Sequence, residues 1–162
     1  MLQMKIRYKK LNERAVNPYK KHSVDAGFDL TATWIKKTDK YIEYGTDLAF
    51  EIPEGYVGLL FPRSSLRDQD LMLKNSVGVI DASYRGEIRF SFHITRELPH
   101  DIRVWHENEG ELITTILEAN IYQVGERCGQ IVIMKIPDIE MIEVEELSNT
   151  DRGTQGYGSS GK

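Results

Sequence analysis

The stretch that most constrains the fold is residues 75–94, NSVGVIDASYRGEIRFSFHI. From 87 to 95 polar and apolar residues alternate strictly, which is the period of a β-strand with one face in a core and the other in water. The β-branched residues Val79 and Ile80 in 78–80 predict a preceding strand, and the turn formers between the two strands predict a β-hairpin. The apolar face of the second strand consists of Ile88, Phe90, Phe92 and Ile94.

The turn of this hairpin presents one carboxylate, that of Asp81. Because Asp81 follows a run that should be buried, we expect its carboxylate to be largely shielded from bulk solvent. An ordinary turn aspartate that caps the backbone explains the same stretch, and taken alone the stretch favours that explanation. Motifs elsewhere in the chain therefore decide whether Asp81 has a chemical role.

Short strands separated by turn formers follow one another along most of the chain, which predicts an all-β fold with the strands in a meander. Residues 125–134 hold a turn and then a strand that is apolar on both faces, so we expect a central strand of a sandwich. The other predicted strands lie within 5–8, around Trp34, and within 47–53, 56–61, 112–117 and 139–145.

One helix start is convincing, within residues 62–68, where Ser64 and Ser65 are good N-cap residues. Free backbone N–H groups at a helix start, together with Arg63 and two hydroxyls, form a ready anion site. The alternative is that Ser64 only caps the helix and that Arg63 is an ordinary surface residue.

Composition excludes several classes of function. A net charge of −4 argues against a nucleic-acid groove, because binding a phosphate backbone favours a basic surface. No apolar run approaches the roughly 18 residues of a membrane span, and the first residues do not resemble a signal peptide. Cys128 is the single cysteine, which we expect to be a buried structural thiol in a reducing compartment. We therefore expect a cytoplasmic protein that binds neither nucleic acid nor membrane.

A chain of 162 residues is long enough for one domain with a real core, which we assign to residues 1–148. Residues 149–162 are rich in glycine and cannot form a core, so by composition they are a disordered terminus. A glycine-rich backbone with serine, arginine and lysine is also typical of segments that wrap phosphates. We therefore predict a flexible C-terminal arm.

Five short motifs occur in the order found in the homotrimeric dUTPases. The third is GVIDASYRGE at 78–87, and the resemblance extends from Asp25 to the end of the chain except for 96–124. Five motifs in the correct order are far more specific than any one of them. The other four lie at 25–32, 62–66, 125–133 and 152–161.

The resemblance implies a jelly-roll-like β-barrel with one short helix and a homotrimer whose three active sites are shared between chains. It implies hydrolysis of dUTP to dUMP and pyrophosphate, which limits uracil incorporation into DNA and supplies dUMP for dTMP synthesis. Asp81 would be the general base that activates the attacking water. Mg²⁺ would bind mainly the triphosphate oxygens, with Asp29 contacting it through water and Asp25 as a weaker candidate.

The resemblance also implies the substrate contacts. Tyr84 would pack under the deoxyribose and leave no room for a ribose hydroxyl, and Tyr157 would stack on the uracil as the arm closes. The residues that would bind uracil and deoxyribose are Asn75, Gly78, Ile80, Tyr84, Arg89 and Tyr157. Those that would bind the phosphates are Arg63, Ser64, Ser65, Gln130, Arg152, Ser159 and Ser160.

Three positions depart from the family pattern: Tyr157 replaces a phenylalanine, Gln155 a glycine, and Ser83 an acid. Two other functions compete with the dUTPase. The dCTP deaminases have a similar barrel, and a nonenzymatic β-barrel could use the same site to sense dUTP. The stretch with Asp81 and Tyr84 favours a dUTPase over both, because a sensor has no need of a water-activating acid.

Overall fold

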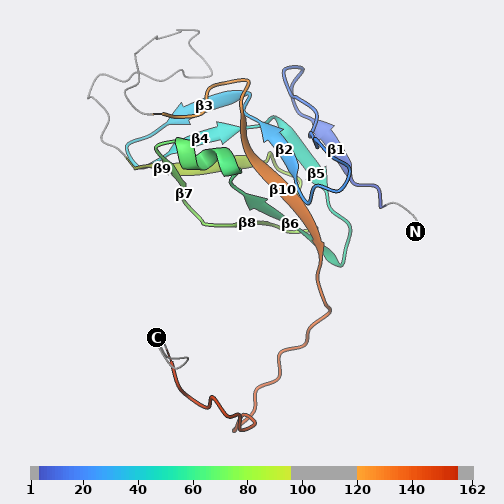
Figure 1. Ribbon diagram of the computed structural model, residues 1–162. Helices are drawn as coiled ribbons and strands as arrows, with labels where there is room; N and C mark the ends of the chain where they lie inside the picture. The colour runs from blue at the N-terminus through green and yellow to red at the C-terminus, as the bar shows by residue number, and fades with distance from the viewer. Residues whose placement is uncertain (1–3, 96–119, 157–162) are drawn as a thin grey trace.

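The structure is a computed structural model that describes residues 4–95 and 120–156. Within these residues the chain is β-structure with one short 3-10 helix, η1, so the all-β prediction is confirmed (Figure 1). No helix of the described part is long and apolar enough to cross a membrane. The elements are β1 Arg7–Lys10, β2 Phe28–Thr31, β3 Trp34–Lys37, β4 Ile42–Gly45, β5 Leu48–Glu51, β6 Tyr56–Phe61, η1 Ser64–Asp68, β7 Leu71–Leu73, β8 Gly78–Ile80, β9 Arg89–Ile94 and β10 Arg127–Lys135.

Two four-stranded antiparallel sheets form a jelly-roll-like barrel (Figure 1). One sheet has the strand order β2-β10-β6-β8 and the other the order β3-β4-β9-β7, while β1 and β5 form a separate pair. Only the β3–β4 pair joins strands that follow each other along the described chain. The jelly-roll prediction is therefore confirmed, and the predicted meander is wrong.

The inner faces of the two sheets share one hydrophobic core. The predicted apolar face of β9 is confirmed, because Phe90 and Phe92 are 1% and 0% exposed while Arg89 and His93 lie in solvent. Tyr44 of β4 meets Phe92 edge to face, with ring centroids 5.6 Å apart, an arrangement that aromatic rings prefer.

β10 lies between β2 and β6, which confirms the predicted central strand. Gly129 in β10 lets the Phe90 ring of the opposite sheet approach the strand closely. A Cβ atom at Gly129 would lie 2.2 Å from that ring, inside van der Waals contact. Cys128 beside it is fully buried, as expected of a structural thiol, and burial raises the pKa of its thiol to about 12.

The predicted hairpin between β8 and β9 is wrong. β8 pairs with β6, whereas β9 pairs with β4 and β7, so residues 81–88 cross from one sheet to the other. The crossing is fixed at its end by Ile88, whose N–H donates to the Leu48 carbonyl at 2.8 Å. Alternation predicts which face of a strand is buried, but it does not identify the partner strand.

Three further predictions need correction or fall outside the description. Residues 139–145 are not a strand, because the chain has left the barrel and no strand of the described residues lies beside it (Figure 1). The helix is confirmed as η1, but its N-cap is Arg63 with no side-chain cap bond, so Ser64 is its first residue and not its cap. The strand predicted at 112–117 lies outside the described residues.

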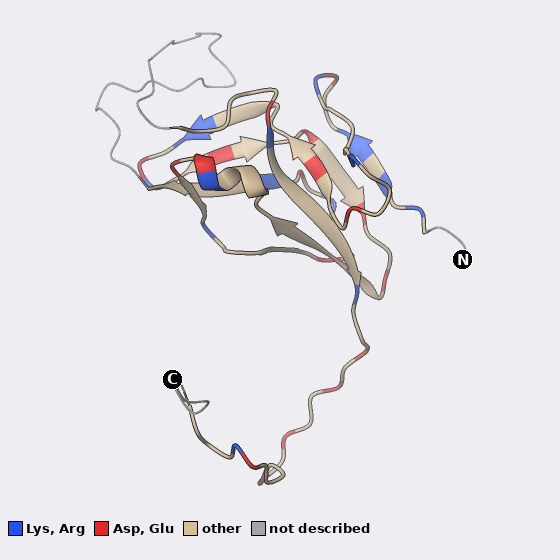
Figure 2. Cartoon of the chain, viewed as in Figure 1, with Lys and Arg blue, Asp and Glu red and all other residues tan. Residues whose placement is uncertain are grey.

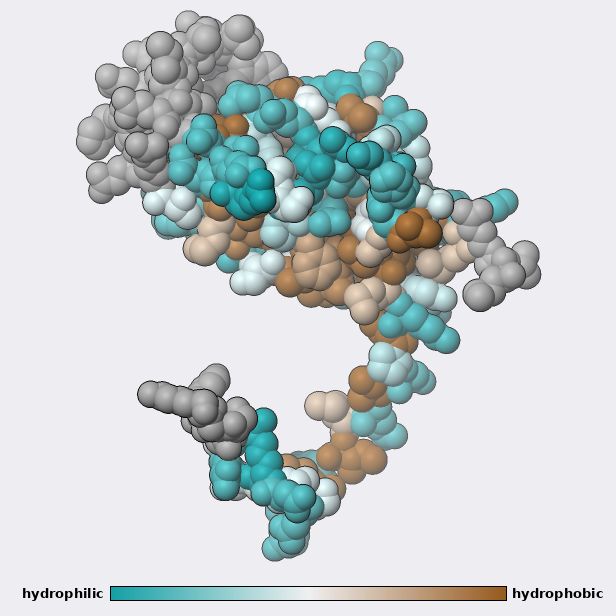
Figure 3. Space-filling view, in the orientation of Figure 1, coloured by the Kyte–Doolittle hydropathy of each residue, from teal (hydrophilic) through white to brown (hydrophobic). Residues whose placement is uncertain are grey.

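The segment that follows β10 runs away from the barrel and exposes apolar side chains (Figures 1 and 3). Within the described residues, the last backbone hydrogen bond from this segment to the barrel runs from the Ile136 N–H to the Gly55 carbonyl, at 2.9 Å. Met141 beyond it is 91% exposed and Leu147 is 86% exposed. Acidic residues are interspersed along the same segment, while β1 carries basic ones (Figure 2).

Candidate active site

Asp29 and two arginines form an ion-pair cluster where β2, β6 and β10 come together. The Asp29 carboxylate accepts hydrogen bonds from Arg63 Nε at 2.8 Å and from an Arg127 terminal nitrogen at 3.0 Å. The Asp29 and Arg63 side chains are 20% and 21% exposed. Arg63 follows β6 directly, and Arg127 begins β10, so antiparallel pairing brings the two cations to the same acid.

Gln130 joins three of the sequence motifs at this cluster. It lies opposite Asp29 on one side of β10 and opposite Phe61 on the other. Its amide nitrogen donates to the Pro62 carbonyl at 2.9 Å. Its amide oxygen faces Gly27, where an added Cβ atom would lie 2.3 Å away. The first, second and fourth motifs therefore meet at one end of the β2-β10-β6 sheet.

Tyr122 supports this cluster and was not identified from the sequence. Its hydroxyl lies 3.1 Å from Ser65 Oγ, which in turn accepts a hydrogen bond from Arg63 at 3.2 Å. Burial raises the pKa of Tyr122, so it remains a neutral hydroxyl. Ser64, by contrast, points into solvent. No local pattern in the sequence predicts this role of Tyr122, because its partner Ser65 is 57 residues away along the chain.

Asp81 and Tyr84 lie on the crossing between the sheets. The Tyr84 N–H donates to the Asp81 carbonyl at 3.0 Å, which forms a turn. Asp81 is exposed in this chain, so the expectation that its carboxylate is shielded from bulk solvent is wrong for the isolated chain. Among the residues that the structure describes, none hydrogen-bonds the Asp81 carboxylate. It is not a backbone cap here and is free to take part in chemistry.

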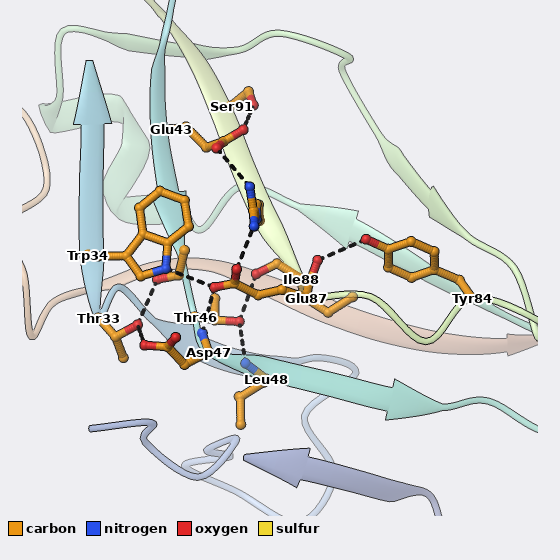
Figure 4. Close-up of polar contacts among 12 residues, drawn as sticks. Thr33, Trp34, Glu43, Thr46, Asp47, Leu48, Tyr84, Glu87, Ile88 and Ser91 are labelled. Carbon is orange, nitrogen blue, oxygen red and sulfur yellow. Dashed lines mark hydrogen bonds and ion pairs between the residues drawn. The ribbon is translucent and has the colours of Figure 1, made fainter. Parts of the chain in front are cut away.

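Tyr84 is held by its own loop (Figure 4). Its hydroxyl donates to the Glu87 carbonyl at 3.1 Å, and its ring lies over Gly86, where a Cβ atom would be 2.3 Å from the hydroxyl oxygen. The Glu87 carboxylate meets Trp34, Asp47 and Arg89. In the sequence Glu87 is only one residue of the third motif, and nothing near it predicts these three contacts.

The other predicted uracil-side residues are divided between the sheets. Gly78 and Ile80 of β8 lie opposite Leu60 and Gly58 of β6. Asn75 is exposed in the turn before β8. Arg89 lies in the other sheet, where its side chain pairs with Glu87 and Glu43 and covers the Trp34 ring, 5.0 Å from the ring centroid.

The two halves of the site lie at opposite ends of β6 within one chain. β8 runs antiparallel to β6, so Asp81 follows the pair Ile80–Gly58 toward the beginning of β6. Arg63 and Gln130 lie at the other end, next to Phe61. Asp81 is therefore level with Val57 and Gln130 with Phe61, and these levels are four residues apart along β6, roughly 13 Å at about 3.3 Å per residue. One chain therefore does not bring Asp81 to the arginine cluster.

Of the C-terminal candidates the structure describes only Arg152, and the segment that carries it runs away from the barrel (Figure 1). Arg152 lies in a turn of the extended segment, where its Nε donates to the Gln155 carbonyl at 3.2 Å. Tyr157, Ser159 and Ser160 lie outside the described residues.

No group of three or more His, Cys, Asp or Glu side chains within 4–95 and 120–156 is arranged to hold a metal ion. Asp29 already pairs with two guanidinium groups, and a direct bond to a metal would disrupt those pairs. The described residues therefore fit a Mg²⁺ ion held by substrate oxygens and water, with Asp29 at most in its outer shell.

Comparison with known proteins gives one consistent result. The family model named dUTPase matches residues 13–104. The deoxyuridine 5'-triphosphate nucleotidohydrolase of Nautilia profundicola is 38% identical, covering 98% of this chain and 100% of the relative. That of Corynebacterium glutamicum is also 38% identical, covering 97% and 95%. Among solved structures, the dUTPase of Staphylococcus bacteriophage 80alpha with dUPNHPP superposes with a TM-score of 0.75 at 30% identity, covering 99% of this chain and 100% of that one.

Proposed function

The chain belongs to the dUTPase family, and from this we propose that it hydrolyses dUTP to dUMP and pyrophosphate. The observation that carries the proposal is the convergence of Asp29, Arg63 and Gln130 at one end of a sheet. Two guanidinium groups, amide donors and serine hydroxyls at one place suit a triphosphate, since positioning and charge neutralisation account for most of phosphoryl-transfer catalysis.

Asp81 acts as the general base in this proposal. Its exposed carboxylate, with no hydrogen-bond donor among the described residues, can take a proton from a water beside the α-phosphorus. The water oxygen then bonds to phosphorus as the bond to the bridging oxygen breaks, and pyrophosphate leaves in line with the attack. The products are dUMP and pyrophosphate.

The phosphate oxygens would be bound by Arg63, Ser64, Ser65 and Gln130. Tyr122 supports Ser65, and Asp29 holds Arg63 in place until the substrate arrives. Mg²⁺ would neutralise charge on the triphosphate, with Asp29 reaching its water shell. That assignment agrees with an Asp29 already committed to two arginines.

The base and sugar would be recognised on the other half of the site. Tyr84 would stand under the deoxyribose, and its ring is already fixed by its hydroxyl bond to the Glu87 carbonyl. Uracil would be read by backbone groups near Gly78, Ile80 and Arg89, with help from Asn75. Tyr157 would stack on the base when the arm closes.

We also propose that the enzyme is a homotrimer with shared active sites. The roughly 13 Å between the two halves of the site, at about 3.3 Å per strand residue, supports a site in which Asp81 comes from one chain and the arginine cluster from its neighbour. The apolar side chains exposed along 137–147 support coverage of this segment by another chain. The arm beyond it would then bring Arg152, Ser159 and Ser160 to the phosphates.

Pyrophosphate release from dUTP, dTTP, dCTP and UTP with Mg²⁺ tests the proposed reaction, with ammonia measured in parallel. We expect release from dUTP alone. Ammonia from dCTP would instead identify a deaminase, and the absence of both products would favour a nucleotide sensor. The Asp81→Asn variant should bind dUTP but turn it over about a thousandfold more slowly, because only the base is lost. Asp39→Asn, in the exposed turn after β3, is the matched control and should retain full turnover.

A further inference from the structure

The Glu87 carboxylate binds two segments of the barrel that are distant from it in sequence (Figure 4), and it also binds its near neighbour Arg89. One oxygen accepts the Trp34 indole N–H of β3 and the Asp47 backbone N–H, each at 2.9 Å. The other oxygen accepts Arg89 Nε of β9, also at 2.9 Å. The Glu87 side chain is only 10% exposed. A carboxylate that accepts three hydrogen bonds with so little exposure is held in one place.

The main chain next to this carboxylate is equally constrained. Ile88 donates its N–H to the Leu48 carbonyl at 2.8 Å, and its carbonyl accepts the Thr46 hydroxyl at 2.7 Å. Residues 87–88 are therefore fastened to the corner between β4 and β5. The Glu87 carbonyl is consequently a fixed acceptor, and it is this carbonyl that receives the Tyr84 hydroxyl.

We propose that Glu87 is a positioning residue that sets the discrimination between deoxyribose and ribose by fixing the Tyr84 ring. The inference rests on the proposed dUTPase function and deepens it. Glu87 touches neither sugar nor phosphate; it fixes the peptide whose carbonyl anchors the Tyr84 hydroxyl. Tyr84 is 44% exposed, so without that anchor its ring can swing away and make room for a 2′-hydroxyl.

Glu87→Gln is the sharpest perturbation of this arrangement. An amide has one oxygen, so whichever way it is turned its NH₂ group faces a donor, either Arg89 or the pair from Trp34 and Asp47. The side chain must shift, although its size is unchanged. Glu43→Gln is the matched control, because Glu43 also pairs with Arg89 but makes its other recorded bond to Ser91, away from Tyr84 (Figure 4).

The experiment measures kcat/KM for dUTP and for UTP in the full-length protein, and the readout is their ratio. We expect Glu87→Gln to lower the dUTP preference about tenfold, the effect of one lost hydrogen bond, and Glu43→Gln to leave it unchanged. In a Tyr84→Phe background, which already lacks the hydroxyl anchor, Glu87→Gln should not lower the ratio any further. A structural role alone would lower both activities together and would not depend on the Tyr84 hydroxyl.

The inference would be overturned if Glu87→Gln left the ratio of kcat/KM for dUTP to that for UTP unchanged. It would also be overturned if Glu87→Gln lowered this ratio as much in the Tyr84→Phe background as in the wild-type background. If Glu87→Gln does not fold, Trp34→Phe removes one of the three donors and carries the same test with the same expected direction. If the wild-type protein does not hydrolyse dUTP at all, the proposed function fails. A wild-type enzyme that prefers dUTP regardless of Glu87 leaves the function standing and rejects only this inference.

Discussion

Asp29→Asn tests whether the ion-pair cluster stabilises the fold. A buried charge-assisted hydrogen bond contributes roughly 1.5–3 kcal/mol, and an exposed pair roughly 0–1 kcal/mol. Arg63 is 21% and Arg127 42% exposed, so we assign about 1.5 kcal/mol to the first bond and about 0.5 kcal/mol to the second. Asparagine retains one acceptor for Arg63, which recovers about 0.5 kcal/mol. The expected loss in the free energy of unfolding is therefore about 1.5 kcal/mol.

The assay is thermal unfolding at one fixed protein concentration, because the melting temperature of the proposed trimer would depend on concentration. For a chain of this size the expected loss lowers Tm by roughly 3–6 °C. The same variant should raise KM for dUTP, because Arg63 loses the group that orients it. Asp68→Asn is the control: its pair with Arg67 is largely exposed, at 67% and 82%, so Tm should not change measurably. Equal Tm values for wild type and Asp29→Asn would refute the assignment of stability to this cluster.

Three other expectations follow from the same structure. Gly129→Val should give little folded protein, since its side chain would overlap the Phe90 ring. Normal yield and Tm would contradict the packing described. Gly55→Ala is the control: it lies in open space at a positive φ and should reduce stability only modestly. The pKa of Cys128, raised to about 12, exceeds that of an unfolded thiol, so ionisation opposes folding as pH rises from 9 toward 12. The free energy of unfolding measured across that range should decline less for Cys128→Ala than for wild type. Alkylation of the Cys128 thiol at pH 8 should proceed only as fast as the protein unfolds. Deleting residues 152–162 should abolish dUTP turnover while sedimentation still shows a trimer; a truncated protein with full activity would exclude the arm from the site.

The sequence alone predicted the parts of the fold that depend on local periodicity. The alternation through Phe90 and Phe92 correctly identified a buried face, because side-chain direction in a strand is set by position alone. The two apolar faces of β10 likewise predicted its central place. The partner of each strand was not predictable in this way, because pairing depends on contacts between distant segments such as Ile88 with Leu48.

The candidate site shows the same division. Ordered motifs identified Asp29, Arg63 and Gln130, which the fold brings together. Tyr122 and the role of Glu87 were missed, because both depend on contacts with residues far away in sequence: Ser65 for Tyr122, and Trp34 and Asp47 for Glu87. Nothing local distinguishes a tyrosine that supports a serine from one that only fills a core.

The separation of the two half-sites along β6 has a genetic consequence. On the proposed arrangement, a chain without Asp81 still offers an intact arginine cluster, and a chain without Arg63 still offers an intact base. Two alleles that are each inactive should therefore complement each other when expressed together. With random assembly of equal amounts, about a quarter of the sites would combine two sound halves.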